Sequence, residues 1–446
     1  FFVFLVIACC GYWAFTQPVT PIQKSIQNFV ADVDFEHASV GIHVVRLSDG
    51  KVLGTYEAKK SLATASTLKV VTTATALLQN GADFRYKTPI GYTGKLQGGI
   101  LKGDLVIKGV GDPTFNSKYF PENDALQKVV DLLKRKKITQ IKGNIVLDDS
   151  NFKSEVPRTW VWEDIGNYYG AALHSINYRD NTYKINFQTG KAGTEARILS
   201  VIPKQNLTFE NKVLASTVNA DNAYIFGSPF SCERVVKGTL PQFRKSFIVK
   251  GAMPNPEITF GEAVKNALQK QGVMVTGKVQ INSVSIQEVL GYIQSPRLKE
   301  IITKTNQHSV NLFAEAMLRL VKNSKSNQQE DLLEALVEFW KNKGLHTDGL
   351  YLHDGSGLSH FNAVNPAFFT EMLRCMTQTK VAGDFKESLA VSGKSGTLKY
   401  LGKNTNLVGK VQGKSGSMQQ VCSYAGYMTT QKGEKVAFAI LLNNFS

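Results

Sequence analysis

Ser66 and Lys69 are the first residues whose types and spacing could perform a reaction. If a helix begins near Ser66, the two side chains lie one helical turn apart, with Cβ atoms roughly 5–6 Å from each other. A serine hydroxyl is a poor nucleophile at neutral pH and needs a base beside it. A lysine amine can be that base when burial lowers its pKa towards neutrality. The pair therefore predicts a lysine-activated serine nucleophile.

The Ser-x-x-Lys pattern occurs three times in the chain, so the spacing alone is weak support. Ser48 and Lys51 lie across a predicted hairpin turn, and Ser150 and Lys153 follow two aspartates at the predicted end of a strand. Only Ser66 opens an apolar segment, KVVTTATALL, whose hydrophobic residues recur at helical spacing. We therefore interpret Ser66 as the nucleophile and the other two serines as incidental.

Two further segments could supply the proton relay and the oxyanion and carboxylate donors that such a serine needs. Ser309 and Asn311 open a predicted helix and offer a hydroxyl and an amide. Lys414, Ser415 and Gly416 come before a predicted hairpin of two apolar strands. With the serine and lysine pair, these segments form the motif set of penicillin-binding proteins and serine β-lactamases.

Each of these segments also has a second match in the chain. Ser175 and Asn177 repeat the Ser-x-Asn spacing, but they precede a strand in a β-rich region. Lys394 and Gly396 match the lysine and glycine pattern, but a glycine-broken segment follows them. Their context makes both pairs weaker candidates for the reaction.

The sequence around the motifs resembles the D-alanyl-D-alanine carboxypeptidase/endopeptidase family of class C low-molecular-mass penicillin-binding proteins, peptidase family S13. The resemblance extends over nearly the whole chain. Two departures are mild: Ser415 replaces the usual threonine, and Val110 stands where a glycine is common. The segments that carry the resemblance are GVGDPTF at 109–115, SVNLFAE at 309–315, DGSGLSHFN at 354–362, SGTL at 395–398 and GKSGSM at 413–418.

The resemblance implies a role for each catalytic residue. Ser66 is expected to be the acylated nucleophile and Lys69 its base. Ser309 is expected to pass the proton to the departing D-alanine, and Asn311 to bind the substrate amide. Lys414 is expected to add positive charge for the terminal carboxylate of the substrate.

The resemblance also implies a set of substrate-binding residues. Ser415 is expected to donate to the terminal carboxylate, and Gly416 to let the substrate backbone lie flat on the strand. The backbone N–H of Ser417, with that of the nucleophile, is expected to form the oxyanion hole. Asp148 either faces the free amine of the stem peptide or caps a turn, and the sequence leaves both readings open.

The function implied is that of a serine DD-peptidase acting on peptidoglycan stem peptides. It would cut terminal D-Ala-D-Ala and D-Ala-diaminopimelate cross-links through an acyl-enzyme, and β-lactam antibiotics would bind it covalently. No cofactor and no metal are expected, because the chain lacks His-Glu-x-x-His and paired cysteine motifs. The alternatives are a serine β-lactamase, for which no second base can be placed, and a catalytically silent wall-binding protein, against which the intact motifs argue.

Composition and charge agree with an exported folded protein. The chain has 446 residues, 43% hydrophobic and 20% charged, which fits two or three domains. The net charge is +16, but the basic residues are scattered, which favours peripheral contact with an anionic envelope over nucleic-acid binding. Nothing in the sequence indicates an oligomeric state.

Residues 1–16 are apolar and read as the remnant of a signal peptide, which predicts a periplasmic or cell-envelope location. Cleavage before Gln17 would release a soluble protein, whereas a lipoprotein-like sequence would leave a lipid anchor at Cys9. Cys232, Cys375 and Cys422 allow one disulfide and one thiol, or three buried thiols.

The pattern of elements predicts an α+β fold. A helix over 20–35 and a hairpin lead into the Ser66 helix, and helices and a closing hairpin follow residue 290. We expect these two ends to share one antiparallel sheet flanked by helices, as in the transpeptidase domain of penicillin-binding proteins and β-lactamases. The division predicted is a catalytic domain of 20–86 and 290–446, a β-rich inserted domain II of 87–111 and 179–289, and a domain III of 112–178 nested within it.

We expect the inserted domains to lie beside the active site, to restrict access to it and to select the stem peptide. Because they carry none of the three motifs, the sequence predicts that penicillin acylation does not depend on them.

Overall fold

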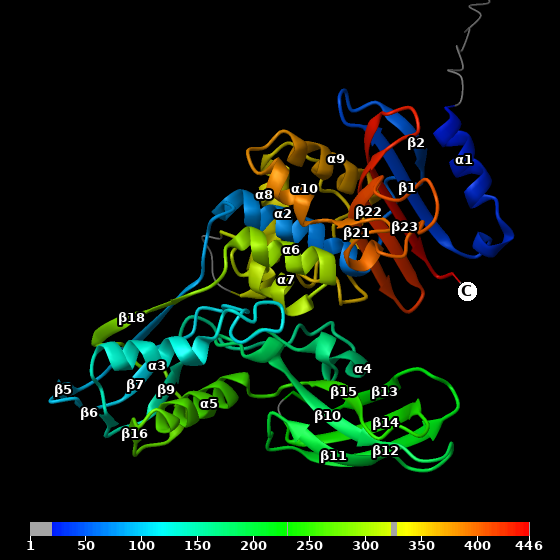
Figure 1. Cartoon of the computed structure of the whole chain (residues 1–446). Helices are drawn as coiled ribbons and strands as arrows, with labels where there is room; N and C mark the ends of the chain where they lie inside the picture. Colours follow the sequence, from blue (N-terminus) through cyan, green and yellow to red (C-terminus); the bar gives the residue numbers. More distant parts are fainter. Residues whose placement is uncertain (1–19, 230, 323–327, 446) are drawn as a thin grey trace, which may run out of the picture.

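The computed structural model describes residues 20–229, 231–322 and 328–445. They form two lobes, one above the other in Figure 1. The upper lobe holds both ends of the described chain, and the lower lobe holds the segment between β4 (Lys87–Tyr92) and β18 (Glu288–Gln294). The signal remnant expected at 1–16 and the lipid anchor at Cys9 lie outside the described residues.

A six-stranded antiparallel sheet joins the two ends of the chain in the upper lobe. Its order is β2-β1-β23-β22-β21-β20, and β1 pairs with β23 from Ser39 opposite Asn443 to Arg46 opposite Val436. This pairing confirms that the two ends share one sheet. The strands are β1 (Ser39–Arg46), β2 (Val52–Tyr56), β20 (Ala390–Val391), β21 (Val411–Met418), β22 (Val421–Thr429) and β23 (Lys435–Asn443).

Helices cover both faces of this sheet. On one face lies α1 (Pro21–Val30), capped by the Thr20 side chain, and the other face carries the helical cluster around α2 (Lys69–Asn80) (Figure 1). The helix expected over 20–35 is divided, because α1 ends at Val30 and a short 3-10 turn, η1 (Val33–Phe35), follows. The remaining helices of the cluster are α6 (Leu298–His308), α7 (Asn311–Leu318), α8 (Gln329–Asn342), α9 (Pro366–Thr377) and α10 (Ala382–Ser388).

Helix α2 is the centre of the cluster. Every residue from Lys69 to Leu77 is buried, including four polar ones, because α6, α7, α8 and α9 all contact it. The buried threonine hydroxyls have hydrogen-bond partners inside the protein. Thr73 donates to the Lys69 carbonyl, and Thr75 accepts from the Trp340 indole N–H. The buried helix predicted to begin near Ser66 is therefore present, although its first turn is the 3-10 turn η2 (Ala65–Leu68).

The larger part of the lower lobe is built on a five-stranded sheet of order β17-β9-β7-β4-β18 and a four-stranded one of order β16-β8-β6-β5. Helices α3 and α5 pack on these sheets in one hydrophobic core, which includes Ile107, Val129, Ile145 and Phe260. The additional elements are β5 (Lys95–Gln97), β6 (Ile100–Lys102), β7 (Leu105–Lys108), α3 (Ala125–Arg135), β8 (Gln140–Ile141), β9 (Ile145–Asp148), α5 (Pro256–Lys270), β16 (Met274–Val275) and β17 (Val279–Ile281).

A smaller β unit completes the lower lobe. Two three-stranded sheets, β11-β10-β15 and β12-β14-β13, enclose a core that contains Tyr183, Phe187, Val213 and Val236. Within it β12 and β14 run parallel. Its strands are β10 (Thr182–Gln188), β11 (Arg197–Ile202), β12 (Thr208–Ser216), β13 (Asn222–Phe226), β14 (Glu233–Pro241) and β15 (Phe247–Ala252).

The pairing in the lower lobe does not follow the boundary expected at residue 111. Strand β9, which falls within the segment 112–178, pairs in parallel with β7 from before that boundary. Segment 112–178 therefore shares a sheet and a core with 87–111, and the enclosed unit is the one formed by 182–252. Sequence periodicity could not reveal this, because it identifies strands but not which strands pair.

The remaining elements of the described chain are short. They are β3 (Leu62–Ala63) paired with β19 (Ala363–Val364), α4 (Trp162–Ile165), and the 3-10 turns η3 (Tyr168–Gly170), η4 (Arg179–Asn181) and η5 (Gly396–Leu398). Of these, η3 contacts α7 and therefore brings the lower lobe against the helices of the upper lobe.

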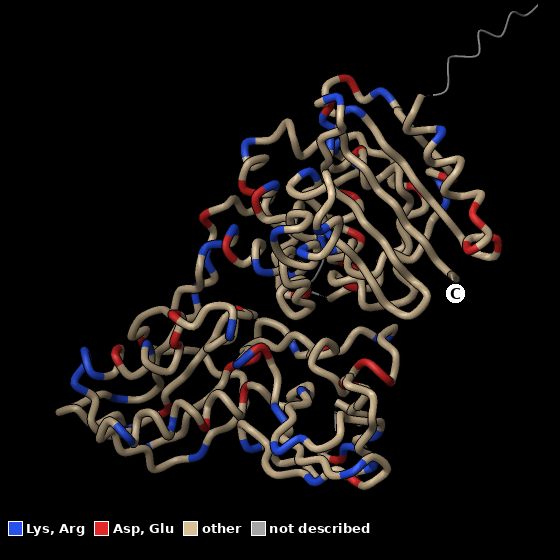
Figure 2. Tube along the Cα trace, turned by 45° about the vertical axis from the view of Figure 1, so that its right-hand side comes forward, with Lys and Arg blue, Asp and Glu red and all other residues tan. Residues whose placement is uncertain are grey.

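Charged residues of both signs are spread over both lobes, as Figure 2 shows. In the described part of the chain, no helix has the length and apolar character that crossing a membrane requires. Cys232, Cys375 and Cys422 are all free thiols, and Cys232 is exposed. This differs from both expectations, a disulfide or three buried thiols, because these three cysteines form no disulfide with one another and one of them faces solvent.

Candidate active site

Ser66 and Lys69 meet at the junction of η2 and α2. Ala65 has a left-handed backbone, with φ 43°, and the chain turns there into the 3-10 turn that carries Ser66. Lys69 is the first residue of α2, so its side chain points back towards η2. As a result the Lys69 Nζ lies 2.8 Å from the Ser66 Oγ.

The Lys69 amine has three oxygen neighbours. Besides the Ser66 hydroxyl, these are Asn311 Oδ1 at 2.6 Å and the Ser356 backbone carbonyl at 2.5 Å. The amide and backbone oxygens can only accept hydrogen bonds, so a neutral Lys69 amine donates its two N–H groups to them. Its lone pair is then directed at Ser66, whose hydroxyl donates to it. This geometry is what a base needs to remove the serine proton.

The surroundings of Lys69 also favour the neutral amine. The side chain is completely buried, and this burial lowers the pKa of Lys69 to about 7, although the carboxylates of Asp354 and Glu315 act in the opposite direction. An amine with this pKa is about half neutral at pH 7, and the neutral fraction can accept a proton. Burial and the two oxygen acceptors thus supply the activation that the serine hydroxyl lacks.

The Asn311 amide has a fixed orientation. Its Nδ2 donates to the Tyr169 carbonyl at 2.8 Å, so that Oδ1 faces Lys69. Tyr169 belongs to η3, in the segment inserted between the two halves of the catalytic sheet. The lower lobe therefore takes part in arranging the site, rather than only lying beside it as the sequence predicted.

Ser309 lies between α6 and α7, two residues before Asn311. Its backbone is left-handed, with φ 57° and ψ 45°, and it ends α6. Such a conformation is uncommon for a residue other than glycine and marks a sharp turn between the two helices. Both helices contact α2, so the turn that carries Ser309 is held beside the helix of Lys69.

Strand β21 brings Lys414 and Gly416 to the same place. Gly416 lies against η2 so closely that an added Cβ would come within 2.6 Å of the Thr64 carbonyl oxygen and 2.8 Å of the Ser66 nitrogen. Only glycine permits this approach. The Ser423 hydroxyl on the neighbouring strand donates to the Thr64 carbonyl at 2.6 Å and ties β22 to the same turn.

Lys414 is as deeply buried as Lys69. Its Nζ donates to the Ser415 carbonyl at 2.5 Å, and burial, followed by the charge of Lys69, lowers the pKa of Lys414 well below its ordinary value. A carboxylate placed beside this amine would favour its charged form. Lys414 lies on the strand that packs against η2, and its role towards the substrate carboxylate stays a prediction.

Ser415 and Ser417 lie further along β21. The Ser415 hydroxyl contacts the Thr397 hydroxyl at 2.8 Å, and Ser417 is exposed opposite Cys422. Thr397 follows the Lys394 to Gly396 segment, which the sequence set aside as a second match. That segment therefore does approach the site, but through Thr397 and not through its lysine.

Asp148 is the last residue of β9, and its side chain is buried. Its Oδ1 accepts from the Ser150 backbone N–H at 2.9 Å, which is the geometry of a turn cap. Of the two readings left open by the sequence, the structure supports the cap. A role towards the amine of a stem peptide stays a prediction.

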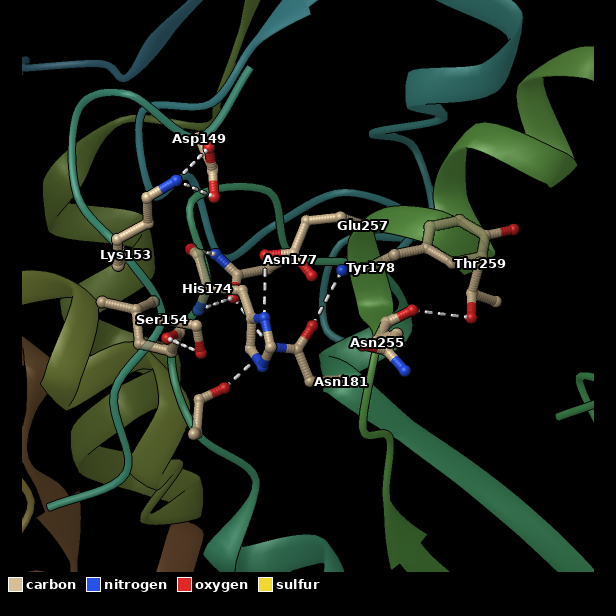
Figure 3. Close-up of polar contacts among 12 residues, drawn as sticks. Asp149, Lys153, Ser154, His174, Asn177, Tyr178, Asn181, Asn255, Glu257 and Thr259 are labelled. Atoms are coloured by element: carbon tan, nitrogen blue, oxygen red, sulfur yellow. Dashed lines mark hydrogen bonds and ion pairs between the residues drawn. The ribbon is translucent and has the colours of Figure 1, made fainter. Parts of the chain in front are cut away.

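Two of the second matches lie away from the site, in the region shown in Figure 3. Lys153 is exposed and forms an ion pair with Asp149 at 2.7 Å. Asn177 accepts from the His174 backbone N–H and from the Asn181 amide, so it holds a turn of the inserted segment. Neither residue contributes to the Ser66 cluster.

Several residues of the site have no role in the sequence-based reading. Asp354 anchors the loop that carries Ser356, accepting from the backbone N–H groups of Gly357 and Ser359, each at 2.6 Å. It also accepts from the Trp160 indole N–H at 2.8 Å, a second contact from the inserted segment. The only signal for this loop in the sequence was the resemblance of residues 354–362 to the family. That resemblance does not indicate which chemical role the loop has.

The described residues contain no group of three or more His, Cys, Asp or Glu side chains that could hold a metal ion.

A serine beside a buried lysine, at the start of a helix packed against an antiparallel sheet, defines a penicillin-recognising serine hydrolase. The chain belongs to the D-Ala-D-Ala carboxypeptidase 3 (S13) family, whose model matches residues 22–446. It is accordingly a serine DD-peptidase, as the resemblance in the sequence indicated.

Curated relatives and solved structures agree with this assignment. The chain is 27% identical to the D-alanyl-D-alanine carboxypeptidase DacB of Haemophilus influenzae, covering 92% of this chain and 86% of that protein. It is 26% identical to the D-alanyl-D-alanine carboxypeptidase of an Actinomadura species, covering 96% and 82%.

The crystal structure of penicillin binding protein 4 from Haemophilus influenzae superposes with a TM-score of 0.79 at 25% identity, covering 92% of this chain and 91% of that one. A second structure of that protein, complexed with a β-lactam, gives a TM-score of 0.77. The α+β fold with inserted domains is thereby confirmed.

Proposed function

We propose that this chain is an exported DD-peptidase of the cell envelope whose nucleophile is Ser66. The observation that carries the proposal is the position of the Lys69 amine, 2.8 Å from the Ser66 hydroxyl and held by two further oxygens. Lys69 takes the Ser66 proton while Oγ bonds to the carbonyl carbon between the two D-alanines. The tetrahedral intermediate collapses to an acyl-enzyme, and the terminal D-alanine departs as the amine.

The residues around the pair have distinct roles in this proposal. Ser309 relays the proton to the departing amine, and Asn311 binds the substrate amide while also holding Lys69. Lys414 and Ser415 bind the terminal carboxylate, whose negative charge favours the ammonium form of Lys414. The backbone N–H groups of Ser66 and Ser417 stabilise the oxyanion.

The substrates proposed are peptidoglycan stem peptides, both free ends and cross-links between D-alanine and diaminopimelate. For the second substrate class, we propose that the lower lobe, which contacts the site through Tyr169 and Trp160, binds the second peptide strand. Asp148 is a candidate for the amine of that strand. β-Lactams, which resemble D-Ala-D-Ala, would acylate Ser66 in the same way.

We further propose a catalytic domain of 20–86 and 290–446, with the interval as an inserted region. The six-stranded sheet and the helices around α2 support the first part. Within the inserted region the shared core favours one unit of 87–178 and 256–289, with the β unit of 182–252 enclosed in it. Peripheral contact with the envelope is proposed from the net charge of +16.

The test is intact-mass measurement after incubation with benzylpenicillin. One adduct is expected on the wild-type protein and none on Ser66→Ala, and peptide mapping should place it on Ser66. Slow release of the adduct is expected for a DD-peptidase, whereas rapid turnover of penicillin would indicate a β-lactamase. A wild-type protein without an adduct would contradict the proposal.

A further inference from the structure

Glu315 is a buried carboxylate that the reaction as described does not use. It lies on α7 one turn after Asn311, so both residues lie on the face that meets α2. Glu315 is only 5% exposed. A carboxylate that has lost its water must have partners inside the protein, and those partners show what it can do.

The partners of Glu315 belong to the loop that holds Lys69. Both Glu315 carboxylate oxygens lie 3.1 Å from the Gly355 backbone N–H. The carbonyl of Gly355 accepts from the Thr72 hydroxyl at 2.7 Å, and the next carbonyl, that of Ser356, accepts from Lys69. Glu315 thus binds Gly355, the residue directly before Ser356, whose carbonyl oxygen orients the Lys69 amine.

The loop packs closely against α7 at Gly355. A Cβ added to Gly355 would come within 3.0 Å of the Leu318 Cβ and 3.1 Å of the Ala314 carbonyl oxygen, both on α7. Helix α7 therefore holds Lys69 by two routes. Asn311 binds its amine directly, and Glu315 binds it through the Gly355–Ser356 segment.

Charge connects the same groups. Lys69 on α2, Asp354 and the Ser356 hydroxyl on the loop, and Arg319, which directly follows α7, all interact with Glu315. Burial, with a smaller contribution from Asp354, raises the pKa of Glu315, while its hydrogen bonds and Lys69 lower it. Asp354 accepts four hydrogen bonds, two from backbone N–H groups and two from side chains.

We propose that Glu315 is a positioning residue for Lys69 and, together with Asp354, a counter-charge for the ammonium ion that forms when Lys69 takes the Ser66 proton. Through Gly355 it fixes the Ser356 carbonyl that directs the Lys69 lone pair at Ser66. Its carboxylate also stabilises the positive charge that appears on Lys69 during acylation. The inference rests on the proposed function, since it assumes that Lys69 is the base.

The test compares Glu315→Gln with the wild-type protein by the rate of penicillin acylation between pH 5 and 9. A glutamine oxygen can still accept from the Gly355 N–H, so a purely structural role would leave the profile unchanged. Without the negative charge, the pKa of Lys69 falls, because its ammonium form loses a stabilising neighbour. The acidic limb of the profile should move down by about one pH unit, and the maximal rate should fall about tenfold.

Glu262→Gln is the matched control, because Glu262 is an exposed residue of α5 in the lower lobe. It should reproduce the wild-type profile. A Glu315→Gln profile with the wild-type limb, whatever its maximal rate, would overturn the counter-charge role. If Glu315→Gln does not fold, Glu315→Asp decides. The aspartate keeps the negative charge but is too short to reach Gly355 in the same way. The acidic limb of its pH profile should therefore match that of the wild-type protein, while its maximal acylation rate should be lower. A maximal rate equal to that of the wild-type protein would overturn the proposal.

These outcomes are separable from failure of the proposed function. If the wild-type protein forms no adduct at Ser66, the function itself is refuted. If the wild-type protein is acylated at Ser66 and the profiles of all three proteins coincide, only the role of Glu315 fails.

Discussion

The segments Ser66 to Lys69 and Ser150 to Lys153 have the same spacing but opposite surroundings. Lys69 is fully buried and holds hydrogen bonds to a hydroxyl, an amide oxygen and a backbone carbonyl. The Lys153 side chain is 74% exposed and pairs with Asp149, one turn before it. An exposed pair of this kind contributes little to stability.

The comparison shows that the spacing supplies proximity and the fold supplies the chemistry. A charged lysine cannot accept a proton, whatever serine lies near it. Burial removes the charge from Lys69, and two acceptor oxygens then orient the neutral amine. The acceptors come from α7 and from the loop at 354–359, far from Lys69 in sequence.

The largest effect is expected for Lys69→Arg. A guanidinium does not release its proton at neutral pH, so acylation by penicillin should fall at least about a thousandfold. Lys153→Arg is the matched control and should react at the wild-type rate. Both rates are measured by intact-mass spectrometry, with thermal unfolding as a check on folding. A measurable reaction of Lys69→Arg near the wild-type rate would show that another group is the base.

A smaller effect is expected for Asn311→Asp. A carboxylate in place of the amide oxygen, 2.6 Å from the Lys69 amine, would raise the pKa of Lys69 and keep it charged. Acylation at pH 7 should fall about a hundredfold, since the pKa would rise by about two units, and it should recover as the pH is raised. Asn177→Asp, in the turn of Figure 3, should lower the stability and leave this pH dependence unchanged. Equal pH profiles for the two variants would contradict the role of Asn311.

The smallest effect is expected for Trp160→Phe, which removes the indole N–H that Asp354 accepts and keeps an aromatic ring. One hydrogen bond to a carboxylate contributes about 1.5–3 kcal/mol to the free energy of unfolding. Because three other donors still hold Asp354, acylation should slow by roughly threefold to tenfold. Trp162→Phe is the control, as Trp162 is 56% exposed.

This variant also tests how far the inserted region is separate from the catalytic one. The sequence predicts that acylation does not depend on the insertion, whereas the contacts of Trp160 and Tyr169 predict that it does. Wild-type acylation by Trp160→Phe would favour the prediction from the sequence.

The sequence predicted what depends on residue type and local spacing. The Ser66 helix and the closing hairpin are present, because apolar periodicity determines them. The partners of the site were not predicted. The Ser356 and Tyr169 groups that hold Lys69 and Asn311 are backbone carbonyls, which every residue has, so no residue type signals them.

The strand pairing of the lower lobe was also beyond the sequence. Strands β7 and β9 pair in parallel across a helix, and the chain then leaves for the unit at 182–252 before β17 and β18 complete the sheet. Each strand could be recognised alone, but their order depends on how the two cores pack.

The most direct test of the central claim is the pH dependence of penicillin acylation by the wild-type protein. If burial makes Lys69 a base with a pKa of about 7, the rate should rise with pH and reach half of its maximum near pH 7. Lys153→Arg should follow the same curve, because Lys153 takes no part in the reaction. A rate that stays constant across pH 5 to 9, or rises only near the ordinary lysine value of about 10.4, would contradict the account.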